Sequence, residues 1–386
     1  MVLDSAGIGE MPDAAAWGDA GADTLGHILE SRHVSVPNLQ AMGLGNIAPL
    51  NGLGAVERPT GSYGKCTLKS DGKDTTTGHW EMAGIILKQG FPKFPDGFPP
   101  RIIDEFVRQT NVPGVLGNVP ASGTEIIKEL GEEHVRTGKP IVYTSADSVF
   151  QIAAHEEVVP IDRLYEMCET ARNILRGDDE VARVIARPFL GNNAADFKRT
   201  ENRHDYAVPP PRNLLPKLKD AGCDVVCIGK IASIYDGIGV TEELTAKNND
   251  QTIDQTINAL HADSHGLIFS NLVDFDMLFG HRRDTEGYAK ALEHFDERLP
   301  EIIDAMNSDD LLIMTADHGN DPTYRGSDHT REYVPLLVYG KAAAPGVCLG
   351  TRQSLSDIGQ TIAENFSVRI EDGISFLENI SLAKFP

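Results

Sequence analysis

The chain has 386 residues, of which 24% are charged, and a formal net charge of −22. This length predicts two or three domains with a substantial core. The acidic balance argues against nucleic acid or an anionic membrane as a partner, because both are bound through an excess of Lys and Arg. No apolar run approaches the roughly 20 residues of a membrane span, and no signal-peptide pattern is visible. We therefore expect a cytoplasmic protein, whose five scattered cysteines are reduced thiols rather than a disulfide or zinc framework.

The first informative segments lie near the N-terminus. Asp4 ends the short apolar run 1–3, and three consecutive threonines, 75–77, precede the apolar run 80–87. The threonines predict the N-cap and first turn of a helix, in which a Thr caps and Glu81 assists. A helix N-terminus also stabilises phosphate oxygens, so one of these hydroxyls is a candidate nucleophile. Residue chemistry alone does not choose among the three.

The middle of the chain is interrupted by two proline-rich breaks. They lie at 91–100 and 208–212. Between them the pattern predicts a strand, a helix and a strand at 141–144, 161–176 and 181–187. We expect a discontinuous core domain of 1–90 and 211–386, with a smaller α+β domain inserted at 91–210.

The C-terminal part alternates apolar strands with amphipathic helices. The expected strands are 224–228, 267–273, 311–315 and 334–339, and the expected helices are 252–262 and 288–305. This alternation predicts an α/β fold with a mostly parallel sheet covered by helices on both faces. Ligands of such sheets bind beyond the carboxyl ends of the strands.

Three of the expected strands end in Asp and His residues. Asp317 and His318 follow 311–315, with His329 close behind, while Asp276 and His281 follow 267–273. Asp4 ends the first apolar run. Taken singly, each of these residues fits a turn cap or a polar loop. Together they predict two metal ions in one site, because carboxylates and imidazoles bind borderline divalent metals. Asp274 competes with Asp276, since strand alternation places both on one face.

A set of basic residues offers phosphate contacts. Spacing by two places Arg183, Ile185 and Arg187 on one strand face. Arg199 and Arg203 follow in a polar segment, and Lys230 ends the expected strand 224–228. The planar guanidinium suits bidentate phosphate binding, although most arginines are solvated surface residues.

Five motifs together resemble the phosphopentomutases, a family of the alkaline phosphatase superfamily, and the resemblance covers essentially the whole chain. The motifs lie at 73–81, 145–157, 202–206, 274–284 and 315–321. The last motif alone is typical of the superfamily only. The resemblance implies an alkaline-phosphatase-like core with an inserted cap domain, in agreement with the break at 91–210.

The resemblance also assigns roles to residues. It implies two Mn²⁺ ions per subunit, one held by Asp4, Asp317 and His318 and the other by Asp276, His281 and His329. It implies Thr75 as the phosphorylated nucleophile. The residues that it places at the sugar or its phosphate are Ser145, Asp147, Val149, Arg183, Ile185, Arg199, Arg203 and Lys230. A sugar bisphosphate such as glucose 1,6-bisphosphate is the implied activator, and we expect a monomer.

The implied reaction moves phosphate between C1 and C5 of ribose or 2-deoxyribose through phosphothreonine and a 1,5-bisphosphate. The alternatives within the superfamily are a two-metal phosphatase and a cofactor-independent phosphoglycerate mutase, which normally uses Ser as its nucleophile. The alternative from another class is a sugar-phosphate binder without turnover, which becomes the stronger reading if a short N-terminus disables the first metal site.

The N-terminus departs from the family pattern. Members of the family have a longer apolar strand before the residue equivalent to Asp4, whereas only three residues precede it here. A missing strand would leave backbone groups of its neighbours unpaired. We expect that adding an apolar segment upstream raises thermal stability and manganese affinity; no change in either would contradict this expectation.

Overall fold

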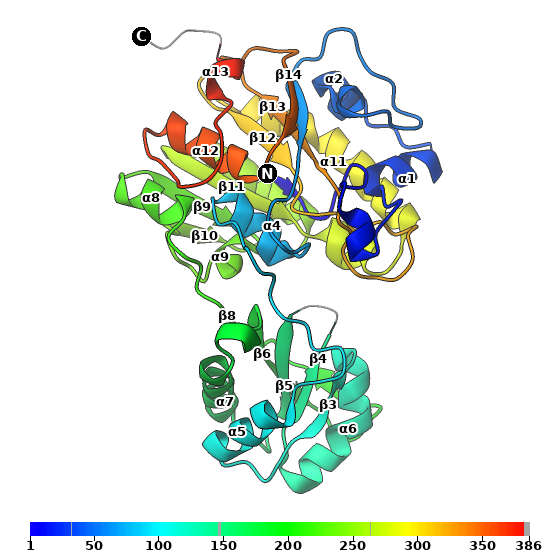
Figure 1. The fold of residues 1–386 in the computed structure, drawn as a ribbon, viewed down its shortest axis with the longest axis vertical. Coiled ribbons are helices and arrows are strands. Elements are labelled where there is room, and N and C mark those ends of the chain that lie inside the picture. Colours follow the sequence, from blue (N-terminus) through cyan, green and yellow to red (C-terminus); the bar gives the residue numbers. More distant parts are fainter. Residues whose placement is uncertain (32, 146–147, 263, 382–386) are drawn as a thin grey trace. The chain divides into compact units, whose positions relative to one another are not determined.

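The computed structural model describes residues 1–31, 33–145, 148–262 and 264–381. The chain divides into two compact units, one of Met1–Gly90 with Pro210–Pro386 and the other of Phe91–Pro209 (Figure 1). The predicted breaks at 91–100 and 208–212 lie at these two boundaries. No described helix is long and apolar enough to cross a membrane.

The first unit is built on an eight-stranded sheet of order β10-β9-β11-β1-β12-β13-β2-β14. Its strands are β1 Val2–Leu3, β2 Ser62–Cys66, β9 Asp224–Ile228, β10 Glu242–Leu244, β11 Gly266–Leu272, β12 Leu312–Thr315, β13 Val334–Tyr339 and β14 Cys348–Arg352. Neighbouring strands are parallel except where β13 pairs with β12 and β2. The predicted α/β class with a mostly parallel sheet is therefore confirmed.

Helices surround this sheet. They are η1 Ala14–Trp17, α1 Thr24–Ser31, α2 Pro37–Met42, α3 Leu44–Ile47, α4 Thr75–Met82, α8 Leu214–Asp220, α9 Ile231–Ile234, α10 Asn249–His261, α11 Thr285–Ala305, α12 Ser356–Asn365 and α13 Leu377–Ile380, with a π-helical segment η3 at Phe275–Gly280. Helix α12 packs against α4 and α8, and α10 packs against α11. The helix expected to run on through 87 ends at Met82, because Gly84 has a φ of +89° that no α-helix accommodates.

The second unit is a sheet between two helical layers. Its elements are α5 Pro100–Thr110, β3 Leu116–Pro120, α6 Gly123–Thr137, β4 Ile141–Thr144, β5 Val149–His155, α7 Ile161–Ile174, η2 Gly177–Asp179, β6 Arg183–Leu190, β7 Lys198–Arg199 and β8 His204–Ala207. Helices α5 and α7 pack on one face through a cluster that includes Phe106, Phe150 and Leu164. Helix α6 packs on the other through Ile126 and Ile127 (Figure 1).

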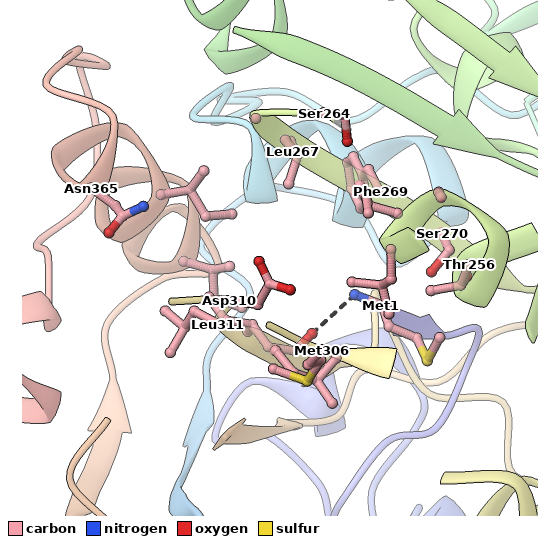
Figure 2. A pocket seen from close by; sticks show the side chains of 18 of the residues that line it. Met1, Thr256, Ser264, Leu267, Phe269, Ser270, Met306, Asp310, Leu311 and Asn365 are labelled. Atoms are coloured by element: carbon pink, nitrogen blue, oxygen red, sulfur yellow. Dashed lines mark hydrogen bonds between the residues drawn. The ribbon is translucent and has the colours of Figure 1, made fainter. Parts of the chain in front are cut away.

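The short strand β1 leaves part of the first sheet unpaired. It pairs with β11 at Asn271 and Leu272 and with β12 at Thr315, so the earlier residues of β11 and β12 face a gap. A cavity of about 310 Å³ occupies this region, with Met306 and Phe269 among its lining residues (Figure 2). The Met1 ammonium group donates a hydrogen bond of 2.9 Å to the carbonyl of Ile313 there. Burial lowers the pKa of this group to about 5, which reflects the cost of placing a charge in the gap.

Candidate metal centre

Three neighbouring strand ends bring the acidic residues together. Strand β1 lies between β11 and β12 and runs parallel to both, with Val2 opposite Asn271 and Thr315. The carboxyl ends of the three strands consequently meet at one edge of the sheet. Asp4 and Asp317 lie just beyond β1 and β12, and Asp276 lies beyond β11 in η3. All three carboxylates are almost fully buried.

Two overlapping groups of ligand atoms form at this edge. Asp4, Asp317 and His318 offer atoms within 4.8 Å of one another, and so do Asp276, His318 and His329. His318 Nε2 lies 3.2 Å from Asp317 Oδ2 and 3.7 Å from Asp4 Oδ1. His281 Nε2 lies 3.2 Å from Asp276 Oδ2. The six residues assigned to metals by the resemblance thus lie in one cluster, with His318 shared between its halves.

The pKa values of the cluster are shifted because its carboxylates lie close together in a buried site. Burial, reinforced by the charge of Asp317, raises the pKa of Asp4 to about 7. Burial alone would lower the pKa of His318, but the carboxylates of Asp317, Asp276 and Asp4 raise it to about 10. Burial likewise opposes ionisation of Asp276, yet the imidazoles of His329 and His281 hold its pKa well below the usual range. The cluster therefore favours positive charge at its centre.

The unsatisfied atoms of the cluster fit a divalent cation. Both carboxylate oxygens of Asp4, Oδ2 of Asp317 and Nε2 of His329 are buried and have no hydrogen-bond partner among the described residues. Burying such atoms without a partner costs free energy, which coordination to a cation offsets. A set of carboxylate oxygens and imidazole nitrogens suits Mn²⁺ or Zn²⁺ better than a soft metal.

Thr75 is the hydroxyl of the threonine run that faces this cluster. Its Oγ1 lies 3.3 Å from His318 Nε2, at the first residue of α4. The expectation of a capping Thr is wrong: Asp74 is the N-cap and accepts hydrogen bonds from the N–H and the hydroxyl of Thr77. The Thr77 hydroxyl is thus occupied by the cap, whereas the Thr75 hydroxyl faces His318.

Glu81 does not assist the cap either. Its buried carboxylate accepts hydrogen bonds from the backbone N–H groups of Lys69 and Ser70, 2.8 and 2.6 Å away, and from the Ser354 hydroxyl. A cap-box partner lies three residues beyond the N-cap, whereas Glu81 lies seven beyond Asp74 and points to the loop before α4. It ties that loop to the segment preceding α12.

Asp274 and Asp276 have different surroundings because of where β11 ends. Alternation would place both on one face only if the strand continued through 276, but it stops at Leu272 and a π-helical turn follows. Asp274 Oδ2 accepts a hydrogen bond from the N–H of Asn249, at the start of α10. Asp276 enters the cluster and accepts a hydrogen bond of 2.7 Å from Asn320 Nδ2.

The sequence reading missed His79, which contacts both Thr75 and Asp317. It is fully buried one helical turn after Thr75, and its Nδ1 lies 2.9 Å from the Thr75 carbonyl and 3.2 Å from Asp317 Oδ2. Asn271 Nδ2 lies 3.0 Å from the other ring nitrogen. The spacing of four from Thr75 was the available signal, because it places both residues on one helix face.

Arg331 was also missed. It is 3% exposed, and its guanidinium donates to three backbone carbonyls in the loop 68–72, which leads into α4. Its own N–H donates to Asp19, whose carboxylate accepts from Lys73 at 2.8 Å. Since Arg331 is two residues from His329, these bonds fix the loop before Thr75 relative to the acidic cluster. A single Arg in a polar segment gives no sequence signal for this role.

The predicted substrate residues fall into both units. Lys230 lies in the first, with Nζ 3.9 Å from Asp4 Oδ2. In the second unit, Val149 lies opposite Arg183 in the β5–β6 register, and Ile185 shares their face. Arg183 Nη1 lies 3.4 Å from the carboxylate of Asp205.

The remaining substrate residues are less regular. Arg203 pairs with Asp205 through two hydrogen bonds of 2.7 Å. Arg199 is exposed in β7, and Ser145 follows β4. Asp147 lies outside the described residues.

Comparison with known proteins shows which family the chain is similar to. The Metalloenzyme superfamily matches residues 1–370. Phosphopentomutase from Symbiobacterium thermophilum is 56% identical over 382 residues, covering 98% of this chain and 97% of its own. Phosphopentomutase from Caldanaerobacter subterraneus subsp. tengcongensis is also 56% identical, with 99% and 97% covered. A solved phosphoglycerate mutase from Leishmania mexicana aligns with a TM-score of 0.42 at 14% identity over 96% of this chain and 95% of its own, too weak a likeness to support an inference.

Proposed function

Because the chain belongs to the phosphopentomutase family of the Metalloenzyme superfamily, we propose that it interconverts the 1- and 5-phosphates of ribose or 2-deoxyribose. The observation that carries the proposal is the Thr75 hydroxyl, which lies 3.3 Å from a ring nitrogen of His318 within the buried acidic cluster. A hydroxyl nucleophile beside a metal centre is suited to phosphoryl transfer.

We propose two Mn²⁺ ions as the resident metals. Asp4, Asp317 and His318 would hold one, and Asp276, His281 and His329 would hold the other. When bound, such ions neutralise charge on a transferring phosphoryl group and favour ionisation of a nearby hydroxyl. The unpartnered buried oxygens of Asp4 and Asp317 support this assignment.

The protein's own residues would position the reacting threonine. Asp74 caps α4, and His79 holds the Thr75 carbonyl, so the first turn of the helix is fixed beside Asp317. Phosphorylated Thr75 would transfer its phosphoryl group to the free hydroxyl of the incoming pentose monophosphate, giving a 1,5-bisphosphate. The other phosphoryl group of this bisphosphate would then return to Thr75, which releases the isomeric monophosphate and restores the phosphoenzyme.

Residues 91–210 would form the cap of the enzyme. Val149, Arg183 and Ile185, which share one face of its sheet, support a role in sugar-phosphate contact. We assign the same role to Ser145, Asp147, Arg199 and Arg203 by their motifs. A sugar bisphosphate such as glucose 1,6-bisphosphate would prime Thr75. We place the enzyme in the cytoplasm as a monomer, with no nucleic-acid partner, in keeping with its net charge of −22.

Phosphorus NMR tests the proposal. The protein is incubated with Mn²⁺, a trace of glucose 1,6-bisphosphate and ribose 1-phosphate. Conversion to ribose 5-phosphate without accumulation of inorganic phosphate is the expected result. Steady release of inorganic phosphate would identify a phosphatase instead, and binding of the sugar phosphate without turnover would identify a non-catalytic binder.

A further inference from the structure

One buried carboxylate near the metal centre lies outside both groups of ligand atoms. Glu332 is fully buried, and its two oxygens accept four hydrogen bonds. Oε1 accepts from the hydroxyls of Thr24 and Thr330, each 2.6 Å away. Oε2 accepts from the N–H groups of Thr24 and Gly9, 2.8 and 3.3 Å away. Burial raises the pKa of Glu332 to about 7, whereas the bonds from Thr24 and Thr330 favour its ionised form, which only accepts hydrogen bonds.

The Glu332 side chain packs between the loops that follow β1 and β12. A Cβ atom on Gly7 would lie 2.4 Å from its Oε2, and a Cβ atom on Gly319 would lie 2.3 Å from its Oε1. Both loops therefore approach the carboxylate more closely than any residue with a side chain would allow. The first of these loops begins with Asp4 and the second follows Asp317. Glu332 is thus a fixed point shared by two of the segments that bear the proposed metal ligands.

Thr24 connects Glu332 to Asn320. The Thr24 hydroxyl is fully buried and has one hydrogen, which it donates to the carboxylate of Glu332. Its oxygen is then free to accept, and it accepts a hydrogen bond of 3.1 Å from the backbone N–H of Asn320. The Thr330 hydroxyl donates to the same oxygen of Glu332 over the same distance, but the Asn320 N–H is bonded to Thr24. Only one of the two threonines therefore extends the chain of hydrogen bonds.

Asn320 brings the chain to a proposed metal ligand. Its side chain is almost fully buried, and Nδ2 donates a hydrogen bond of 2.7 Å to Asp276 Oδ1. Because a carboxylate only accepts, the amide nitrogen rather than the amide oxygen must face Asp276. A Cβ atom on Gly280, the last residue of η3, would lie 2.8 Å from the Asn320 side chain, so the amide has little room to turn. Partners that orient a metal-binding side chain in this way contribute about 10- to 100-fold to metal affinity.

We propose that Thr24 and Asn320 are positioning residues, which hold the Asp276 carboxylate in place for a metal ion through a hydrogen-bond chain anchored at Glu332. The chain reaches only one half of the cluster, so it acts on the ion assigned to Asp276 and not on the ion assigned to Asp4. Its members orient a ligand and take no part in the reaction itself. The inference rests on the proposed function in treating Asp276 as a metal ligand.

Titration of the metal-stripped full chain with Mn²⁺ tests the chain, with the free ion counted by electron paramagnetic resonance. Thr24→Val keeps the shape of the side chain and removes the hydroxyl, and it should weaken binding of one ion about tenfold. Thr330→Val is the matched control, because it removes a buried hydroxyl from the same oxygen of Glu332 and leaves the bond to Asn320 intact. It should bind Mn²⁺ as the wild type does. Equal affinities in these two variants would overturn the proposal.

Two further variants keep the test independent of how well Thr24→Val folds. Thr24→Ser retains the hydroxyl and should bind Mn²⁺ with wild-type affinity. Asn320→Ala removes the last donor of the chain but keeps the backbone N–H that Thr24 accepts, and it should weaken the same ion at least as much as Thr24→Val does. Wild-type affinity in Asn320→Ala, or a loss in Thr24→Ser as large as in Thr24→Val, would contradict the chain.

Mutase assays separate this inference from the proposed function. In Thr24→Val the Mn²⁺ concentration for half-maximal turnover should rise about tenfold, while kcat at saturating Mn²⁺ stays within about twofold of the wild type, because Asp276 itself is retained. A merely structural role would lower the thermal midpoint without changing the Mn²⁺ dependence, and that result would overturn the inference alone. Weaker Mn²⁺ binding in Thr24→Val, in a protein that does not interconvert the pentose phosphates, would refute the proposed function alone.

Discussion

At the scale of single residues, the candidate metal centre contains buried carboxylate oxygens that accept no hydrogen bond from the described residues. Asp4 has no hydrogen bond on either oxygen among the described residues, while Asp317 accepts only on Oδ1, from the Ser5 N–H at 3.0 Å. Ser5 adopts a φ of +71° to make that bond, a conformation that costs free energy for a residue other than glycine. Folding therefore places backbone strain, and carboxylate oxygens without hydrogen bonds from the described residues, where a cation would be bound.

Thr75 should be the only essential hydroxyl of the threonine run. Thr75→Ala is expected to lower kcat by at least about a thousandfold, since it removes the hydroxyl that we propose as the carrier of the phosphoryl group. Thr76→Ala is the control, because Thr76 lies on the same helical turn and should retain most activity. Mass spectrometry after incubation with glucose 1,6-bisphosphate should find phosphate on Thr75. Phosphorylation of the Thr75→Ala variant, or equal losses in both variants, would contradict the assignment.

Metal binding should release protons. In the metal-stripped protein the pKa of His318 is about 10 and that of Asp4 about 7, so near pH 7 the cluster holds protons that a metal must displace. Manganese affinity is therefore expected to fall as pH is lowered from 8 to 6. Calorimetry in two buffers of different ionisation enthalpy measures the release directly. His318→Asn, which binds no proton at that position, should release fewer protons. Equal release in this variant would contradict the role of His318.

At the scale of elements, sequence patterns predicted the strands better than the helix caps and turns that connect them. Strand β9 was predicted without error, and β11 and β12 to within one residue at each end, because continuous apolar runs mark buried parallel strands. The candidate metal-binding residues were predicted from those strand ends, and the structure brings them into one cluster. The cap on α4 was assigned to the wrong residue, although Asp is a favoured N-cap and the bonds of Asp74 to Thr77 are local. The π-helical turn after β11 leaves no period in the sequence. Arg331 was missed because the partners of its side chain are distant in the chain. His79 carried a signal that was not used, its spacing of four from Thr75.

Close packing of α4 against the end of β12 should make Gly78 irreplaceable. A Cβ atom there would lie 2.2 Å from the carbonyl oxygen of Asp317, so Gly78→Ala must push the helix away from the metal ligand. We expect a loss of about 1–3 kcal/mol in unfolding free energy, together with weaker manganese binding, measured by urea unfolding and metal titration. Gly54→Ala is the matched control, because its nearest neighbour would be 4.0 Å away. Similar behaviour of the two variants would contradict the packing argument.

At the scale of the whole molecule, the candidate metal centre is assembled from residues that are far apart in the sequence. Asp4 and His329 are widely separated in the chain, and Phe91–Pro209, which lies between them in the sequence, folds as a compact unit with its own hydrophobic clusters. Contacts between distant parts of a chain carry a high cost in loop-closure entropy. Completion of the metal centre therefore reports on folding of the whole first unit rather than on any local segment.

This organisation predicts that metal stabilises the two units unequally. A metal ion that binds only the folded state, at a concentration 100 times its Kd, adds about 2.7 kcal/mol to the free energy of unfolding. The residues that we propose to coordinate the metal all belong to the first unit. Hydrogen exchange with and without Mn²⁺ should therefore show slower exchange in β11 and β12, whereas β5 in the second unit serves as an internal control with little change. Equal slowing in β5 would contradict independent stability of the units and would mean that both unfold as one cooperative body.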